Sequence, residues 1–398
     1  MLKTLSLILS LTVFLAAIWI IIPAPAYFIW LFSVAASEWS LWIAALALTA
    51  IIFSVCIPIS GGDGKLWIVS LIVSSVALVI SLYPFFSIRH LANEQNVSLS
   101  IGEYFSGSRN DDSSDRDFTT RIFVEIDGKD VQLDVYSPTV LNENKGAAVV
   151  VIHGGSWNAG SRNDFPQWNR WLAANGFTVF DIDYRLAPQP NYLSSTGDVK
   201  CAVRWIKKHS SEFEISPDRI ALFGRSAGAH LALLAAYSAD DSRLPPGCLQ
   251  DEQDGQIRAV VSFYAPVDLI WDYDNPANRF VINGPKTLAD FLGGNPHESN
   301  ELRERFILAS PTAHVSAKTP PTLLVHGGRD QLVRSENMQI LDEKLNEANV
   351  PHKTLFIPYA QHGFDYDSHG WGAQIVKPAM LEFLRENTRA NNTLKRLE

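Results

Sequence analysis

A serine flanked by small residues is the first candidate for chemistry: Gly224-Arg225-Ser226-Ala227-Gly228. The apolar run 219–223 before it is typical of a strand, and the Ala- and Leu-rich run 227–237 after it is typical of a buried helix. A serine at a sharp strand-to-helix turn exposes its hydroxyl at the positive end of the helix dipole. The simpler alternative is that Ser226 only caps the helix. The surrounding pattern favours a nucleophile.

Attack by a serine hydroxyl requires a base, and the base requires a carboxylate that orients it. Two later segments supply these groups directly after apolar runs, because Asp330 follows 322–326 and His362 follows 353–357. Loops that follow parallel strands gather at one edge of a sheet, so their side chains meet. We therefore expect Ser226, Asp330 and His362 to form a catalytic triad for acyl transfer.

Other carboxylates and histidines compete for these roles. We expect Asp268 to cap or pack the segment after its strand, and Glu336 to occupy the first turn of a helix, where a carboxylate favours the dipole. The remaining candidate histidines either pack structurally or lack a strand-end position: His153, His230, His326 and His369.

A tetrahedral intermediate of acyl transfer needs hydrogen-bond donors for its oxyanion. The segment His153-Gly154-Gly155-Ser156-Trp157 follows the apolar run 147–152, and its glycines let the backbone approach a substrate closely. The alternative is an ordinary turn. The backbone N–H groups expected to face the oxyanion belong to Gly154, Gly155 and Ala227. The aromatic residues that either line a substrate pocket or pack in the core are Trp157, Trp168 and Trp171.

Residues 118–390 alternate between strand-like and helix-like apolar runs. A hairpin is predicted at the start, where Asp127-Gly128 separates 121–126 from 131–136. Repeated strand–helix units follow, and they predict an α/β fold with a mostly parallel sheet covered by helices. Residues 268–314 interrupt this rhythm and are expected to form a lid or cap over the sheet edge.

Residues 1–88 are nearly uncharged and rich in Leu, Ile, Val, Ala and Trp. About 20 apolar residues cross a bilayer, and three runs approach that length: Leu5–Ile22, Trp39–Ile57 and Leu66–Phe86. Gly61-Gly62-Asp63-Gly64 is predicted as the turn between the last two runs. The shorter run Tyr27–Ser37 is expected to lie in the interface, or to extend the second span and accommodate Glu38.

Two topologies are open for this transmembrane region. The first run is retained as a span, or it is a signal peptide cleaved near Ala24-Pro25-Ala26. Both leave the following domain outside, because three spans from an inside N-terminus and two from an outside one end on the same side. A fourth span within 24–58 would reverse this. Residues 89–117 are expected to form a polar linker, with 109–115 as a loop.

Composition excludes several partners. The net charge of −9 argues against nucleic acid, because nothing would neutralise the phosphates. No cysteine–histidine cluster indicates zinc, and no cofactor is expected. Cys56 lies in an apolar run and is expected to be a small buried hydrophobe. Cys201 and Cys248 are able to pair, but their spacing leaves the pairing open, and the oligomeric state is open as well.

Together the motifs resemble the hormone-sensitive-lipase-like esterases of the α/β-hydrolase superfamily. The residues that carry this resemblance, within 118–388, are His153-Gly154-Gly155, Asp183-Tyr184-Arg185-Leu186-Ala187-Pro188, Gly224 to Gly228, Asp330 and His362-Gly363-Phe364. The resemblance implies that Gly154, Gly155, Ser156 and Ala227 surround the oxyanion. Ser156 replaces a third glycine, as in relatives similar to feruloyl esterases, kynurenine formamidase and prenylcysteine methylesterase. The resemblance implies a carboxylesterase or lipase-like serine hydrolase for a small-molecule or lipid ester, here anchored in a membrane.

Three other functions are weighed against this one. The same triad would serve an amide-directed hydrolase, either a formamidase or a peptidase. A catalytically silent scaffold would be expected to lack a triad member, and none is missing. A transporter or channel is disfavoured because the apolar runs contain no paired intramembrane charges.

Overall fold

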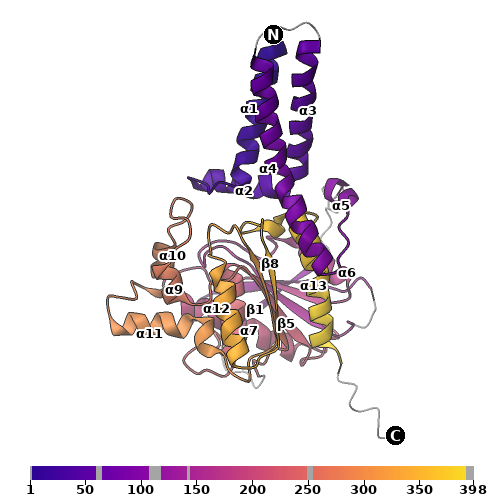
Figure 1. Cartoon of the computed structure of the whole chain (residues 1–398). Coiled ribbons are helices and arrows are strands. Elements are labelled where there is room, and N and C mark those ends of the chain that lie inside the picture. The colour runs from indigo at the N-terminus through magenta and orange to yellow at the C-terminus, as the bar shows by residue number, and fades with distance from the viewer. Residues whose placement is uncertain (1, 60–64, 107–117, 141–143, 249–253, 391–398) are drawn as a thin grey trace.

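A computed structural model describes residues 2–59, 65–106, 118–140, 144–248 and 254–390. It consists of an N-terminal helical bundle and an α/β domain below it (Figure 1). The predicted turn at 61–64 and the predicted loop at 109–115 lie outside the described residues.

The bundle contains α1 (Leu2–Ala17), α3 (Ser40–Ile59) and α4 (Leu66–Glu94), which lie side by side. Within these helices, Lys3–Ile20 (which includes the 3-10 turn η1, Ile18–Ile20), Ser40–Ile57 and Leu66–Glu94 are long and apolar enough to cross a membrane. Buried serines join the helices, since Ser6 and Ser54 hydroxyls lie 3.0 Å apart and Ser74 donates to Ser10 at 2.8 Å. Such hydrogen bonds are common between membrane helices.

Two parts of this region differ from expectation. The α4 helix continues to Glu94 and therefore extends into the segment predicted as a linker, where α5 (Ile101–Ser106) also forms. The expectation for Cys56 was wrong, because its side chain is exposed on the outside of α3. Other faces of α3 pack against α1 and α4, and Cys56 lies on a face that neither helix covers. The short apolar run forms α2 (Tyr27–Glu38), which lies across the base of the bundle (Figure 1).

The α/β domain is built on one eight-stranded sheet with the order β1-β2-β4-β3-β5-β6-β7-β8. Strand β2 pairs antiparallel with both β1 and β4. All the other neighbouring strands of the sheet pair in parallel. This confirms the predicted mostly parallel sheet. The strands are β1 (Phe118–Ile126), β2 (Lys129–Tyr136), β3 (Ala148–Ile152), β4 (Thr178–Ile182), β5 (Ile220–Arg225), β6 (Ala259–Phe263), β7 (Thr322–Gly327) and β8 (His352–Ile357).

Helices cover both faces of this sheet, as the buried apolar strands require. One face packs against α7 (Tyr192–Lys208), α8 (Ala227–Tyr237) and α12 (Glu336–Glu347). The other packs against α6 (Pro166–Ala174), α13 (Trp371–Thr388) and the end of α4. The excursion after β6 contains α9 (Leu269–Asp274), α10 (Gly284–Leu292), α11 (Asn300–Ala309) and η3 (Pro311–His314). A last short turn, η4 (Phe364–Tyr366), precedes α13.

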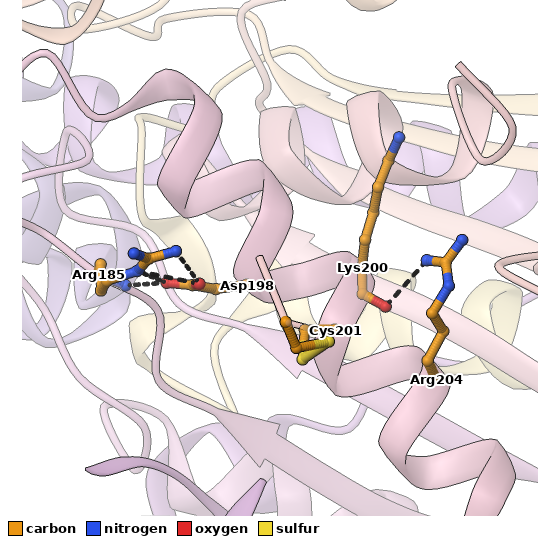
Figure 2. Close-up of a disulfide and its surroundings, with 6 residues drawn as sticks. Arg185, Asp198, Lys200, Cys201 and Arg204 are labelled. Atoms are coloured by element: carbon orange, nitrogen blue, oxygen red, sulfur yellow. Dashed lines mark hydrogen bonds and ion pairs between the residues drawn. A yellow bond between two sulfur atoms is a disulfide. The ribbon is translucent and has the colours of Figure 1, made fainter. Parts of the chain in front are cut away.

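A disulfide joins Cys201 on α7 to Cys248, with their Cα atoms 5.7 Å apart (Figure 2). It ties α7 to the loop that follows α8. One turn earlier on α7, Asp198 binds Arg185, whose Nη2 lies 2.6 Å from the Asp198 carboxylate (Figure 2). The Arg185 of the Asp-Tyr-Arg motif therefore anchors its loop to the same helix.

Candidate active site

Ser226 occupies a strained turn between β5 and α8, with φ 53° and ψ −123°. Non-glycine residues with this backbone conformation are uncommon, and they concentrate at functional sites. The turn depends on close backbone approaches. A Cβ on Gly228 would lie 2.2 Å from the carbonyl oxygens of Ile152 and His153, and a Cβ on Gly224 would lie 2.3 Å from the carbonyl oxygen of Gly228. Both positions therefore require glycine.

Asp330 and His362 are brought into direct contact at the carboxyl ends of β7 and β8. His362 Nδ1 lies 2.7 Å from Asp330 Oδ2. The other carboxylate oxygen accepts two backbone N–H groups, from Leu332 at 2.8 Å and Val333 at 2.9 Å. The carboxylate is therefore held in one orientation, with one oxygen directed at the imidazole.

The same carboxylate also touches His326, whose Nε2 lies 3.2 Å from Asp330 Oδ2 and 3.1 Å from the carbonyl oxygen of Val333. Burial raises the pKa of Asp330, but the charge and hydrogen bonds of His362 and His326 outweigh burial and hold that pKa below its ordinary value. Asp330 is thus an ionised partner suited to stabilising a protonated imidazole.

A buried network connects the Ser226 turn to the loop that carries His362. Arg225, next to Ser226, binds the Asp365 carboxylate, which also accepts the Tyr264 hydroxyl at 2.5 Å. The Tyr264 ring lies 4.3 Å from the His362 ring, measured between centroids. Ser226 itself is held by its backbone N–H, which donates to the Phe263 carbonyl at 2.9 Å. Among the described residues, no hydrogen bond joins the Ser226 hydroxyl to His362.

The predicted oxyanion residues lie beside Ser226. Ser156, Ser226 and Ala227 line one cavity, and a Cβ on Gly154 would lie 3.4 Å from the Ser226 Cβ. Gly155 and Ser156 both have positive φ, at 109° and 53°. This turn brings the backbone of the loop close to the serine.

The cavity at Ser226 has a volume of about 60 Å³ and runs under the excursion. Trp157, Asp272, Ile282 and Leu288 are among its walls. Trp157 also stacks on Phe291 of α10, with ring centroids 4.3 Å apart. The segment 268–314 therefore roofs this side of the site. In contrast, Trp168 is fully buried in the core beside Arg225.

The competing residues have structural roles. Asp268 caps α9 by accepting the Trp271 N–H at 3.1 Å, and Glu336 pairs with Arg334 in the first turn of α12. His230 is buried and bonds the Ala309 carbonyl at 2.8 Å. His153 stacks on Tyr184, whose hydroxyl donates to the His153 carbonyl at 3.1 Å.

Sequence reasoning missed the Arg225–Asp365–Tyr264 network and a further set of contacts from the N-terminal region. Ala24 N–H donates to Gln331 Oε1 at 2.7 Å, and the side chain of Arg329 bonds the Ile21 carbonyl. Both partners flank Asp330. Within the described residues, no group of three or more potential ligands is arranged to hold a metal.

Comparisons with known proteins identify the family and the fold of this chain. Residues 133–345, more than half of the chain, match the BD-FAE family model. A probable carboxylic ester hydrolase, LipM of Mycobacterium tuberculosis, is 32% identical over 248 residues, covering 60% of this chain and 54% of LipM. The esterase LipQ of the same organism is 28% identical over 261 residues, covering 65% and 59%. The chain thus spans little more than half the length of these relatives.

The solved structures point to the same fold. The apo form of Thermogutta terrifontis esterase 2 matches with a TM-score of 0.55 and 25% identity, over 69% of this chain and 96% of that one. The native form of the same esterase gives a TM-score of 0.55 at 23% identity. The domain therefore has the α/β-hydrolase fold, and the chain belongs to the BD-FAE family.

Proposed function

We propose that this protein is a membrane-anchored serine hydrolase that cleaves carboxylic esters through an acyl-enzyme. The observation that carries the proposal is the 2.7 Å contact between His362 Nδ1 and the buried Asp330 carboxylate, on the edge of the sheet where Ser226 turns into α8. The relatives named as ester hydrolases support the same reaction class.

In this mechanism His362 takes the proton of the Ser226 hydroxyl, and the serine oxygen attacks the ester carbonyl. Asp330 orients the imidazole through Nδ1 and stabilises the imidazolium that forms. The oxyanion is stabilised by backbone N–H groups around Gly155, Ser156 and Ala227. The imidazolium then protonates the leaving alcohol, and water repeats the cycle on the acyl-enzyme.

Anchoring in a membrane is supported by the three long apolar helices and by the many large apolar side chains exposed on the bundle. An apolar surface of this size is rarely exposed to water, and it usually marks a contact with a membrane or with another protein. The Cys201–Cys248 disulfide supports an extracytoplasmic α/β domain, because disulfides persist in oxidising compartments.

The first test treats membranes that contain the protein with a fluorophosphonate probe, beside a Ser226→Ala variant. We expect the wild type to be labelled and the variant to remain unlabelled. Absence of labelling in folded wild-type protein would refute the activated serine. A panel of matched esters and anilides then separates ester from amide hydrolysis.

A further inference from the structure

A second cavity, separate from the roofed cavity at Ser226, has His362 in its lining. It has a volume of about 290 Å³ and lies between α2 and the loop after β8. The catalytic-domain side contributes Phe165, His362, Gly363, Tyr366 and Asp367. The N-terminal side contributes Trp30, Leu31, Val34, Ala35, Glu38 and Trp39. One wall of this cavity beside His362 is therefore built by α2 and the residue that follows it.

Direct bonds hold this wall in place. Trp39 Nε1 donates to Asp367 at 3.0 Å, and the Tyr359 hydroxyl donates to Glu38 Oε2 at 3.3 Å. At the start of the same segment, Asn278 of the excursion donates to the Ala24 carbonyl at 2.6 Å. The α2 helix is thus fixed at both ends to the loops that surround the triad.

The lining of this cavity suits a hydrocarbon. Most of its residues are apolar or aromatic, and its one fully buried carboxyl is Glu38. Burial, and next the charge of Asp367, raise the pKa of Glu38 well above its ordinary value, so the protein disfavours the charged form of this carboxyl. The outer side of α2 exposes Phe28, Leu31 and Phe32, where an interfacial helix contacts lipid.

The two cavities adjoin different residues of the triad. This difference indicates which cavity binds the acyl half of an ester and which binds the alcohol half. The small cavity adjoins Ser226 and the oxyanion residues, where the acyl carbon must lie. The large cavity adjoins His362, which must protonate the leaving oxygen. The leaving alcohol therefore extends from His362 towards α2.

We propose that the cavity between α2 and His362 binds the alcohol portion of a membrane-dissolved ester, so that the substrate joins a short acyl group to a long or bulky apolar alcohol. This inference rests on the proposed hydrolase function. The alcohol portion of the intact ester extends along α2 towards the bilayer, while its carbonyl group lies at Ser226.

Two isomeric esters test the assignment, because dodecyl acetate and ethyl dodecanoate have the same atoms and differ in which half is long. In proteoliposomes we expect kcat/KM for dodecyl acetate to exceed that for ethyl dodecanoate by roughly tenfold or more, since two buried methylenes already amount to about that factor. Equal rates, or a preference for ethyl dodecanoate, would overturn the assignment.

A cavity-filling variant tests the role of α2. Ala35→Trp should lower the ratio of kcat/KM for dodecyl acetate to that for ethyl acetate by roughly tenfold. The matched control is Ala45→Trp, which adds the same side chain at an exposed position of α3 and should leave the ratio unchanged. An unchanged ratio in Ala35→Trp would refute the site.

Fluorophosphonate labelling of Ser226 separates this failure from others. If the Ala35→Trp variant is labelled, it is folded, and its ratio of kcat/KM for dodecyl acetate to that for ethyl acetate decides the test. If the variant is not labelled, Val34→Phe takes its place in the same comparison. If the wild type neither reacts with the probe nor cleaves ethyl acetate, the proposed hydrolase function fails and the alcohol site fails with it. If the wild type is labelled and cleaves ethyl acetate but shows no preference between the isomers, only the alcohol site fails.

Discussion

At the scale of single residues, Asp330 is the most fully constrained group of the site. It accepts two backbone N–H groups on one oxygen and faces two imidazoles with the other. Asp330→Asn keeps the shape but removes the charge, so that the amide no longer fixes the tautomer of His362. We expect kcat on a short ester to fall by about 10³–10⁴-fold. A loss of less than tenfold, in a variant with an unchanged melting temperature, would contradict this role.

A second residue-scale prediction concerns Asp272, in the wall of the small cavity. Burial raises its pKa to about 8, although Asn337 donates to it at 2.6 Å. The folded protein therefore holds a proton that the unfolded chain has lost above its ordinary pKa of about 4. Stability must fall as pH rises from about 4 to about 8, because the folded state binds more protons across that window.

Asp272→Asn should remove this dependence. Thermal unfolding of both proteins at several pH values is the measurement, and we expect the variant to be the more stable at pH 8, with the difference shrinking towards pH 5. Asp218→Asn, at an exposed position before β5, is the control. A pH-independent difference between the Asp272 variant and the wild type would show that the carboxyl is not the cause.

At the scale of elements, the Arg225–Asp365 pair joins the β5–α8 turn to the loop after β8. Both side chains are buried, and Arg225 also lies 4.2 Å from the centroid of the Phe165 ring. Arg225→Met should cost about 3–5 kcal/mol in the free energy of unfolding, because it leaves the Asp365 charge buried and unpaired. It should also lower kcat, since the His362 loop loses its tether.

The double variant Arg225→Met/Asp365→Asn is the test of cause. Removing the charge with its partner should restore a large part of the stability, measured by denaturant unfolding. If the double variant is as unstable as the single one, lost packing of the Arg225 side chain explains the effect and the ion pair does not.

Features that depend on local pattern could be predicted from the sequence. The helix at Ala227–Tyr237 has the predicted bounds. The strands that precede Asp330 and His362 form at the apolar runs that predicted them. The start of α7 could not be predicted, because its first turns contain Ser194, Ser195 and Gly197, which are weak helix formers. Ser195 and Gly197 are buried there, and this packing stabilises the helix.

Partners chosen by tertiary packing were beyond local pattern. Arg225 and Asp365 lie 140 positions apart, and Glu38 and Tyr359 lie 321 apart. Arg225 occupies the variable position of its motif, and Glu38 is an acidic residue at the end of an otherwise apolar helix. Neither position indicates its partner from the local sequence. Only the fold shows that the first fixes the histidine loop and that the second joins α2 to the α/β domain.

At the scale of the whole molecule, the bundle has a small core cluster of its own, but the end of α4 and α5 pack into a core cluster of the α/β domain. Tyr104 of α5 stacks on Trp371 of α13 with centroids 4.4 Å apart, and Ile88 and Ala92 at the end of α4 are buried in the same cluster. The N-terminal region therefore contributes to the stability of the α/β domain. Removing it would expose Trp371 and the apolar face around it to water.

The topology proposed for this arrangement places the α/β domain outside, with three spans between it and an inside N-terminus. The hydrogen bonds that join α1 to α3 and α4 favour retention of the first span over its cleavage. In intact cells, a membrane-impermeant fluorophosphonate should label Ser226 without permeabilisation, and the tryptic peptide Thr4–Lys65, which contains the first span, should be recovered. Labelling only after permeabilisation would mean an inside domain and an even number of spans. Such a result would also remove the oxidising environment that the Cys201–Cys248 disulfide requires.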